Sequence, residues 1–148
     1  MVRRTSLDQA ECPVARSLDV IGDWWSLLIV RDAFDGVRRF SDFQRGLGVA
    51  KNMLSARLRT LVAAGVLESA PAADGSAYRE YRLTAKGRDL FPVIVALRQW
   101  GERHSFEPGE PHSALVDRAG GRPVARLEIR SRDGARLAPE DTAVIKTG

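Results

Sequence analysis

Residues 51–59 combine a lysine, an asparagine, a serine and an arginine at spacings of one, three and four residues. Asn52 can make paired hydrogen bonds to the edge of an adenine, and Arg59 can bind guanine or a phosphate. Lys51 adds a charge, Ser55 adds a hydroxyl, and Ala56 could touch a thymine methyl group. The alternative is a solvated helix face. We therefore expect nucleic-acid contact here, while the residue that touches a base stays open.

Two consecutive arginines, Arg38 and Arg39, lie just before this segment, next to Ser41. Guanidinium groups at this place could hold backbone phosphates, which set the position of a protein on a duplex. Surface ion pairs with Asp35 or Asp42 are the alternative. We take all three as candidate DNA contacts.

A turn at Asp74-Gly75 separates two short runs of alternating residues, residues 66–70 and 78–83, which is typical of a β-hairpin. Arg79 follows the turn and is a candidate for a phosphate or the minor groove. Tyr81, two residues further on, is a candidate contact that could instead pack in the core.

Cys12 is the only cysteine, so no disulfide can form within one chain. It precedes Pro13, which favours the first turn of a helix, where the partial positive charge stabilises a thiolate. Arg16, one turn further, would act in the same direction. Oxidant or electrophile sensing is therefore one hypothesis for Cys12. An inert, half-buried thiol between subunits is the alternative.

Residue types for other chemistries are missing from the sequence. We find no paired catalytic carboxylates in a credible context, no phosphate-binding loop and no Cys–His arrangement with an orienting group, so an enzyme is not expected. His104 and His112 have no nearby cysteine or carboxylate cluster that would complete a metal site. We expect no metal and no cofactor.

The hydrophobic pattern predicts the elements that position these residues. Helices are expected at residues 13–21, 24–34, 41–47 and 51–64, followed by the hairpin and a helix over 85–104 that Pro92 should kink or split. Leu54, Leu58 and Leu61 should face the core, which turns Asn52, Ser55 and Arg59 outward.

Three end signals support these helices. Asp23 can cap the helix that follows it, and Thr84 can cap the last one. Ser41 and Gln44 have the spacing of a capping box, in which each side chain satisfies a backbone N–H at the helix start.

Two of these helices carry apolar residues that a small domain cannot cover alone. Trp24 and Trp25 begin a helix that is apolar almost all round, and Val93, Leu97 and Trp100 form a stripe near the C-terminal end of the last helix. We expect these residues to form a homodimer interface. The three tryptophans could also line a pocket for a small effector, although plain core packing is the alternative.

Residues 105–112 are rich in proline and acidic residues and suggest a linker, which would leave a main domain at residues 1–104. Residues 113–148 have turns at Gly120-Gly121 and Asp133-Gly134 and suggest short strands. This segment is too small to hold its own core, so we expect it to pack on the main domain. The predicted fold class is α+β, a winged helix-turn-helix with N- and C-terminal dimerisation helices and a small β-rich extension.

The formal charge of +4 is unevenly distributed over the 148 residues. Residues 36–88 carry 10 basic and 4 acidic side chains, whereas residues 1–35 have an acidic excess and residues 89–148 are balanced. A basic excess confined to one segment is typical of phosphate binding, although a chance excess on a solvated surface would look the same. No apolar run approaches the ~20 residues of a membrane span, and no secretory signal begins the chain, so we expect a cytoplasmic protein.

The chain resembles the HxlR (DUF24) family of bacterial winged-helix regulators, which are related to the MarR regulators. The resemblance lies in four stretches in the family's order, which are CPVARSLDVIGDWWSLLIVRD, RRFSDFQRGLGVAKNMLSARLRTLVAAGVLE, YREYRLTAKG and LFPVIVALRQWGE. They cover about residues 12–103.

The resemblance implies a homodimer that binds pseudo-palindromic operator DNA, usually to repress transcription. It assigns residues 51–64 as the recognition helix and residues 66–83 as the wing, and some family members sense oxidants through a cysteine at the position of Cys12. The sequence departs from the family at Trp24, where a lysine is common, and at Ala50, where Ser or Thr caps the recognition helix. A winged-helix module that binds protein instead of DNA is the alternative function.

Overall fold

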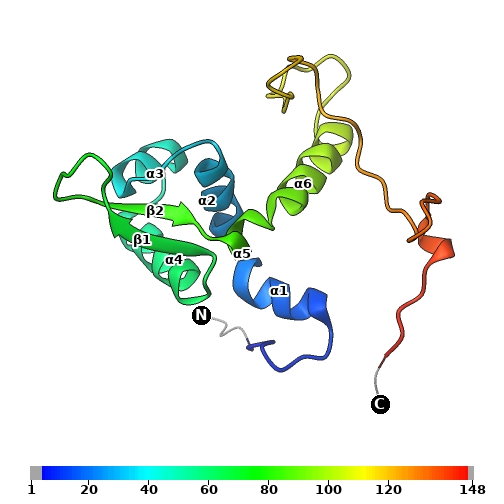
Figure 1. The fold of residues 1–148 in the computed structure, drawn as a ribbon, viewed down its shortest axis with the longest axis horizontal. Helices are drawn as coiled ribbons and strands as arrows, with labels where there is room; N and C mark the ends of the chain where they lie inside the picture. The colour runs from blue at the N-terminus through cyan, green and yellow to red at the C-terminus, as the bar shows by residue number, and fades with distance from the viewer. Residues whose placement is uncertain (1–4, 147–148) are drawn as a thin grey trace. The chain divides into compact units, whose positions relative to one another are not determined.

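The computed structural model describes residues 5–146. The chain divides into two compact units, with the boundary between residues 92 and 93. The first unit contains five helices and a two-stranded sheet (Figure 1). Its elements are α1 (Pro13–Ile21), α2 (Trp24–Phe34), α3 (Phe40–Leu47), α4 (Lys51–Ala63), β1 (Leu67–Pro71), β2 (Arg79–Leu83) and α5 (Ala85–Arg88). The predicted order of elements is confirmed, with most element bounds within one residue.

The core of the first unit lies between α2, α3, α4 and the start of β1. Phe43 of α3, Ile29 of α2 and the three predicted leucines of α4 are at most 1% exposed. Each such side chain stabilises the fold by roughly 1.5–3 kcal/mol relative to an exposed position. The core therefore fixes which face of α4 turns toward solvent.

The turn between α3 and α4 depends on Gly48, which adopts the left-handed conformation with φ of 64°. A side chain is strained there, whereas glycine is not. The bond from the Gly48 N–H to the Gln44 carbonyl, 2.9 Å long, closes α3. α4 begins at Lys51, three residues after Gly48, which gives the tight helix–turn–helix connection that the sequence predicts.

The predicted capping box at Ser41 and Gln44 is wrong. The N-cap of α3 is Arg39, so Ser41 is the second residue of the helix. No side chain caps this end. The Gln44 amide instead donates to the Val49 carbonyl at 3.5 Å. The S-x-x-Q pattern is too short to fix where a helix begins. The helix starts at Phe40, one residue ahead of the pattern.

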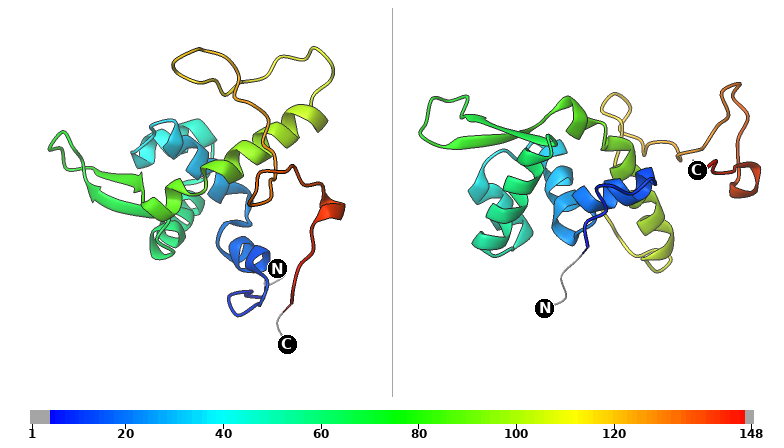
Figure 2. Two further views of the ribbon diagram at one scale, coloured as in Figure 1. Left: turned by 45° about the vertical axis from the view of Figure 1, so that its right-hand side comes forward. Right: turned by 90° about the horizontal axis from the view of Figure 1, so that it is seen from below.

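β1 and β2 form an antiparallel hairpin in which Ser69 lies opposite Tyr81 and Pro71 opposite Arg79. Both strands begin one residue later than the sequence predicts. Figure 2 shows the hairpin loop projecting away from the helices. The hairpin follows α4 directly, as the wing of a winged helix should.

The predicted break at Pro92 is confirmed. α5 ends at Arg88, and α6 (Phe91–His104) begins one residue before the proline. A proline at the second position of a helix removes an N–H that has no partner within the helix. Thr84 caps α5 as predicted, because its hydroxyl accepts from the Gly87 N–H at 3.0 Å.

The second unit comprises most of α6 and the C-terminal segment, with a short 3-10 helix at Pro139–Asp141. The short strands expected after residue 112 reduce to two isolated bridges, between Val116 and Pro123 and between Arg130 and Arg136. The two predicted turns are present, with Gly121 and Gly134 at positive φ. A ladder needs a neighbouring strand, and within residues 5–146 none lies beside these bridges.

Two side chains of α6 hold the C-terminal segment in the second unit. Arg98 donates to the carbonyl and hydroxyl of Ser113 at 3.1 and 2.9 Å. The Gln99 amide donates to the Ala125 carbonyl at 3.1 Å and accepts from the Leu127 N–H at 2.8 Å. The predicted linker at residues 105–112 and the packing of the segment on a main domain stay predictions.

Candidate nucleic-acid interface

The outer face of α4 presents the polar residues that the sequence singles out. Lys51, Asn52 and Arg59 are exposed, and Ser55 and Ala56 are partly exposed. Within residues 5–146, neither Lys51 nor Arg59 takes part in an ion pair. Their charges are therefore available to a ligand at this face.

The start of α4 lacks a side-chain cap. Ala50 is the N-cap residue, with φ of −63° and ψ of 143°, and no side chain accepts from the first turn. The Leu54 N–H bonds the Ala50 carbonyl at 3.0 Å, so the helix begins where the sequence predicts. The first N–H groups of this helix remain available to water or to an anion.

The inner side of α4 is joined to the start of α2 by Asp23 and Arg57. The Asp23 carboxylate caps α2 by accepting from the N–H groups of Trp25 and Ser26, each at 3.0 Å, and from the Ser26 hydroxyl. Arg57 lies 3.5 Å from the same carboxylate, and its buried Nε has no hydrogen-bond partner within the described residues. Burial raises the pKa of Asp23, but the bonds from Ser26 and Trp25 and the charge of Arg57 outweigh it, so the pKa is lowered. The sequence predicts the cap but not the ion pair.

Arg38 contacts the end of α2. Its guanidinium donates to the carbonyls of Ala33 and Val37 at 2.9 and 3.1 Å, and its own carbonyl accepts from the Tyr81 N–H at 2.8 Å. The alternative of an ion pair with Asp35 or Asp42 is wrong for this residue, because backbone carbonyls take its donors. Arg38 thereby ties α2 to the hairpin.

Arg39 is held by the hairpin loop. Its guanidinium forms an ion pair with Asp74 and lies 5.2 Å from the ring centre of Tyr78. Bonds from the backbone and hydroxyl of Ser76, together with Arg39, lower the pKa of Asp74 to about 2. The predicted alternative is an ion pair of Arg39 with Asp35 or Asp42. Arg39 does form an ion pair, but its partner is Asp74. Asp42 pairs with Arg45 instead, at 2.8 Å.

The two hairpin candidates differ in exposure. Arg79 is exposed and donates to the hydroxyl and carbonyl of Ser69 at 2.7 and 3.1 Å. These partners are neutral, so the Arg79 charge is not compensated. Tyr81 is half-buried, and Ser41 of α3 is exposed. The roles of all three in DNA binding stay predictions.

Cys12 is exposed and is the N-cap residue of α1, directly before Pro13 as predicted. The Arg16 side chain, expected to stabilise a thiolate, donates instead to the Ala10 carbonyl. The structure thus places the thiol where a reagent can reach it, but Arg16 is engaged elsewhere.

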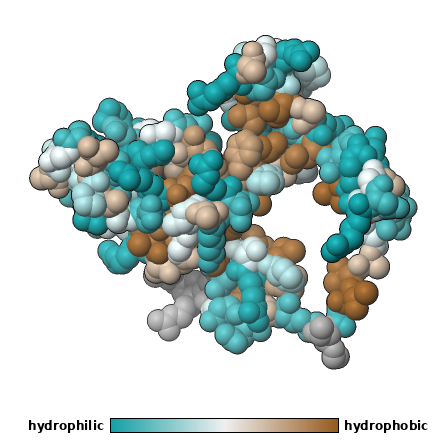
Figure 3. All heavy atoms as spheres, viewed as in Figure 1, coloured by the Kyte–Doolittle hydropathy of each residue, from teal (hydrophilic) through white to brown (hydrophobic). Residues whose placement is uncertain are grey.

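Large apolar side chains predicted for an interface are exposed in the single chain. Trp24 is 85% exposed, and Trp100, Leu97 and Val93 of α6 are 64%, 51% and 39% exposed, whereas Trp25 is half-buried. Figure 3 shows hydrophobic residues gathered at the surface around α6. Val14 and Leu18 of α1, exposed at 65% and 47%, are not among the residues predicted for an interface, although their i, i+4 spacing could have revealed them.

The described residues offer neither a metal site nor a membrane-spanning helix. No group of three or more His, Cys, Asp or Glu side chains within residues 5–146 could hold a metal ion. No helix in this range is long and apolar enough to cross a membrane.

Comparison with known sequences shows where the chain has relatives. A family model described as HxlR-like helix-turn-helix matches residues 20–108. Rv3095 of Mycobacterium tuberculosis, named an HTH-type transcriptional regulator, is 47% identical over 98 residues. The match covers 66% of this chain and 62% of that protein, so the chain spans less than two thirds of the length of this relative.

Solved structures extend the comparison. The structure of PA1607, described as a candidate transcription factor, is 60% identical, with a TM-score of 0.92 and coverage of 97% of this chain and 100% of that one. The redox regulator HypR in its reduced form is 34% identical, with a TM-score of 0.56 and coverage of 64% of this chain and 94% of that one. The α+β winged-helix class predicted from the sequence is confirmed.

Proposed function

The chain belongs to the HxlR-like helix-turn-helix family, and we propose that it is a DNA-binding transcriptional regulator in which α4 enters a major groove. The observation that carries this proposal is the outer face of α4, where Lys51, Asn52 and Arg59 are exposed and have no ion-pair partner among the described residues. The leucine face of the same helix is buried, so the polar face must point outward.

Within this interface we assign base contact to α4 and phosphate contact to the flanking residues. Asn52 and Ser55 can bond base edges, and Arg59 can bond a guanine or a phosphate. Arg79 of the hairpin supplies an uncompensated charge for the backbone of the DNA. Arg38 and Arg39 contribute less than the sequence alone suggests, because α2 and the hairpin loop engage their donors.

A titration against DNA fragments selected from the genome tests this proposal. Asn52→Ala should change the preferred sequence, at a cost of about 1–3 kcal/mol for the best site. Arg79→Ala should weaken binding to all sequences and lower the slope of log affinity against log salt by about 1. Arg132→Ala, which removes an exposed charge from the C-terminal segment, is the matched control and should leave both quantities unchanged.

DNA binding that does not depend on salt, or an unchanged sequence preference after Asn52→Ala, would contradict the proposal that α4 recognises the DNA sequence. A protein partner captured in place of DNA would favour the interaction module. We further propose that the protein represses transcription, as the resemblance to the family implies. A reporter gene placed behind the selected site tests the sign of regulation.

We also propose that the regulator acts as a homodimer. The exposed apolar side chains of α1, of Trp24 and of α6 support an interface that a second copy covers, because soluble monomers rarely expose large apolar patches. A two-fold dimer would place two α4 helices in successive major grooves, about 34–36 Å apart. Operator DNA should accordingly contain two related half-sites.

Oxidant sensing through Cys12 is the switch that we propose for this dimer. Cys12 is exposed at a helix start, and a structural relative is named a redox regulator. Oxidation to a sulfenic acid, followed by a mixed disulfide or a disulfide with the Cys12 of a second copy, would alter the spacing of the two α4 helices. Cys12→Ser should bind DNA normally but lose the response to peroxide. A variant that responds like the parent would reject the switch.

A further inference from the structure

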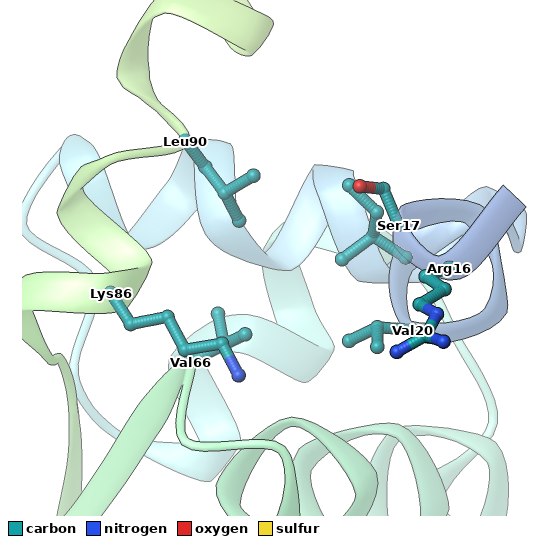
Figure 4. A pocket seen from close by; sticks show the side chains of 7 residues that line it. Arg16, Ser17, Val20, Val66, Lys86 and Leu90 are labelled. Carbon is teal, nitrogen blue, oxygen red and sulfur yellow. The ribbon is translucent and has the colours of Figure 1, made fainter. Parts of the chain in front are cut away.

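A cavity of about 300 Å³ lies within the first unit, between α1, the residue before β1 and α5. Its walls are apolar, formed by Val20 and Ile21 of α1, by Val66 and by Leu90. Figure 4 shows Leu90, Lys86 and Val66 on one side of the space and residues of α1 on the other. None of the three tryptophans lines this cavity, so the expected tryptophan-lined effector pocket is not the one found here.

Two cations line the same cavity. Arg16 comes from α1, where its Nε donates to the Ala10 carbonyl, and Lys86 comes from α5. The Ser17 hydroxyl donates to the Pro13 carbonyl at 2.9 Å. None of the lining residues is acidic. A volume of this size is at the small end for organic ligands, and a few polar groups at an apolar wall fix the orientation of a ligand. These properties match a small organic carboxylate with an apolar body.

Lys86 connects the cavity to α4. Its Nζ donates to the carbonyl of Ala64, the C-cap residue of α4, at 2.6 Å. This bond satisfies one of the free carbonyls at the helix end and places a positive charge where the helix dipole favours it. A carboxylate in the cavity would compete with the Ala64 carbonyl for the ammonium group.

The region beside Lys86 is tightly packed. A Cβ atom at Gly87 would lie 2.1 Å from the Val66 carbonyl oxygen, so α5 and the residue before β1 touch without room for a side chain. The Thr84 N–H bonds the same carbonyl at 3.1 Å. A shift of Lys86 would therefore disturb the segment that leads from α4 into the hairpin.

Part of the cavity wall lies on a different face of α1 from the exposed apolar side chains. At about 100° per residue, Val14 and Leu18 share one face and Arg16 and Val20 lie opposite, whereas Ser17 and Ile21 lie between them. A second copy covering Val14 and Leu18 would not need to cover Arg16 and Val20. We propose that this cavity is an effector site for a small organic carboxylate, which acts on α4 through Lys86; its regulatory part rests on the proposed function.

Benzoate, whose ring and carboxylate match the cavity, is a direct probe of the full-length protein. In an NMR titration without DNA, the amides of Val66 and Leu90 should shift with a Kd on the order of 1 mM, whereas neutral benzamide should cause no saturable shift. Lys86→Gln keeps a donor for Ala64 but removes the charge, and should weaken benzoate binding about tenfold. Arg88→Gln, which removes a charge from α5 outside the cavity, should leave it unchanged.

DNA affinity is then measured with benzoate well above its Kd and with sodium chloride at the same ionic strength. Benzoate should weaken DNA binding by about fivefold or more in the parent and should have no effect on Lys86→Gln. An absence of saturable shifts at Val66 and Leu90, or equal binding by Lys86→Gln, overturns the site. Saturable shifts with unchanged DNA affinity overturn the action on α4. A protein that binds benzoate but no DNA contradicts the proposed function and leaves the carboxylate site standing.

Discussion

Asp23 is the residue on which the start of α2 and the inner side of α4 both depend. Its carboxylate caps α2 and faces Arg57 of α4 at 3.5 Å. Asp23→Ala should lower the free energy of unfolding by about 1–2 kcal/mol, because the cap is lost and Arg57 keeps a half-buried charge without a partner. Urea titration measures this change, and Asp23→Asn, which retains an oxygen acceptor, should cost less.

The same residue makes a pH dependence testable. The pKa of Asp23 in the folded protein lies below its ordinary value of 3.8, because hydrogen bonds and Arg57 outweigh desolvation. Its stabilisation is therefore complete above about pH 4 and is lost as the pH falls through the folded-state pKa. Asp23→Asn should flatten the fall in stability below pH 4. An unchanged acid profile would show that other carboxylates dominate there.

At the residue scale, the sequence predicts contacts only between near neighbours. The cap at Asp23 was predictable because its partners lie two and three residues away. The ion pair of Arg39 with Asp74 spans 35 residues and depends on where the hairpin loop folds back. No local pattern contains that information, so the sequence offers Arg39 as a candidate phosphate contact but cannot predict its ion pair with Asp74.

At the scale of elements, the packing of α5 on the residue before β1 makes a sharp prediction. Gly87→Ala should lower the free energy of unfolding by about 1–3 kcal/mol, because the new Cβ would lie 2.1 Å from a backbone oxygen that cannot move alone. Gly101→Ala is the matched control. It lies in α6 with open space around it, and should raise stability by about 1 kcal/mol through helix propensity. Equal effects of the two changes would contradict the close approach.

The order of the elements was predictable because each has a strong periodic pattern with end signals. The leucines of α4 at i, i+4 and i+7 fixed the buried face, and glycines fixed the turns. The C-terminal segment has alternation at Leu127 and Ile129 but forms only isolated bridges, since strands need partners that the local sequence does not specify. The cavity beside α1 was equally invisible, because its walls come from three separate elements.

At the scale of the whole molecule, two exposed surfaces have different proposed partners. The apolar stripe of α6 would pack against a second copy of the chain, and the polar face of α4 would bind DNA. If both contacts form in one assembly, phosphate contacts from two α4 helices add, and the salt dependence of binding reports their sum. Dimerisation and DNA affinity should therefore change together.

Leu97→Glu tests this coupling. A carboxylate on the α6 stripe would be desolvated in an interface, so sedimentation should show a monomer where the parent is a dimer. If each monomer of the proposed dimer holds one half-site, DNA affinity should fall by more than about tenfold and the salt slope should fall to about half. Ala119→Glu, in an exposed turn of the C-terminal segment, adds the same charge and should change neither quantity. A Leu97→Glu protein that stays dimeric and binds DNA with the parental salt slope would exclude α6 from the interface and leave α1 and Trp24 as the remaining apolar surfaces for it.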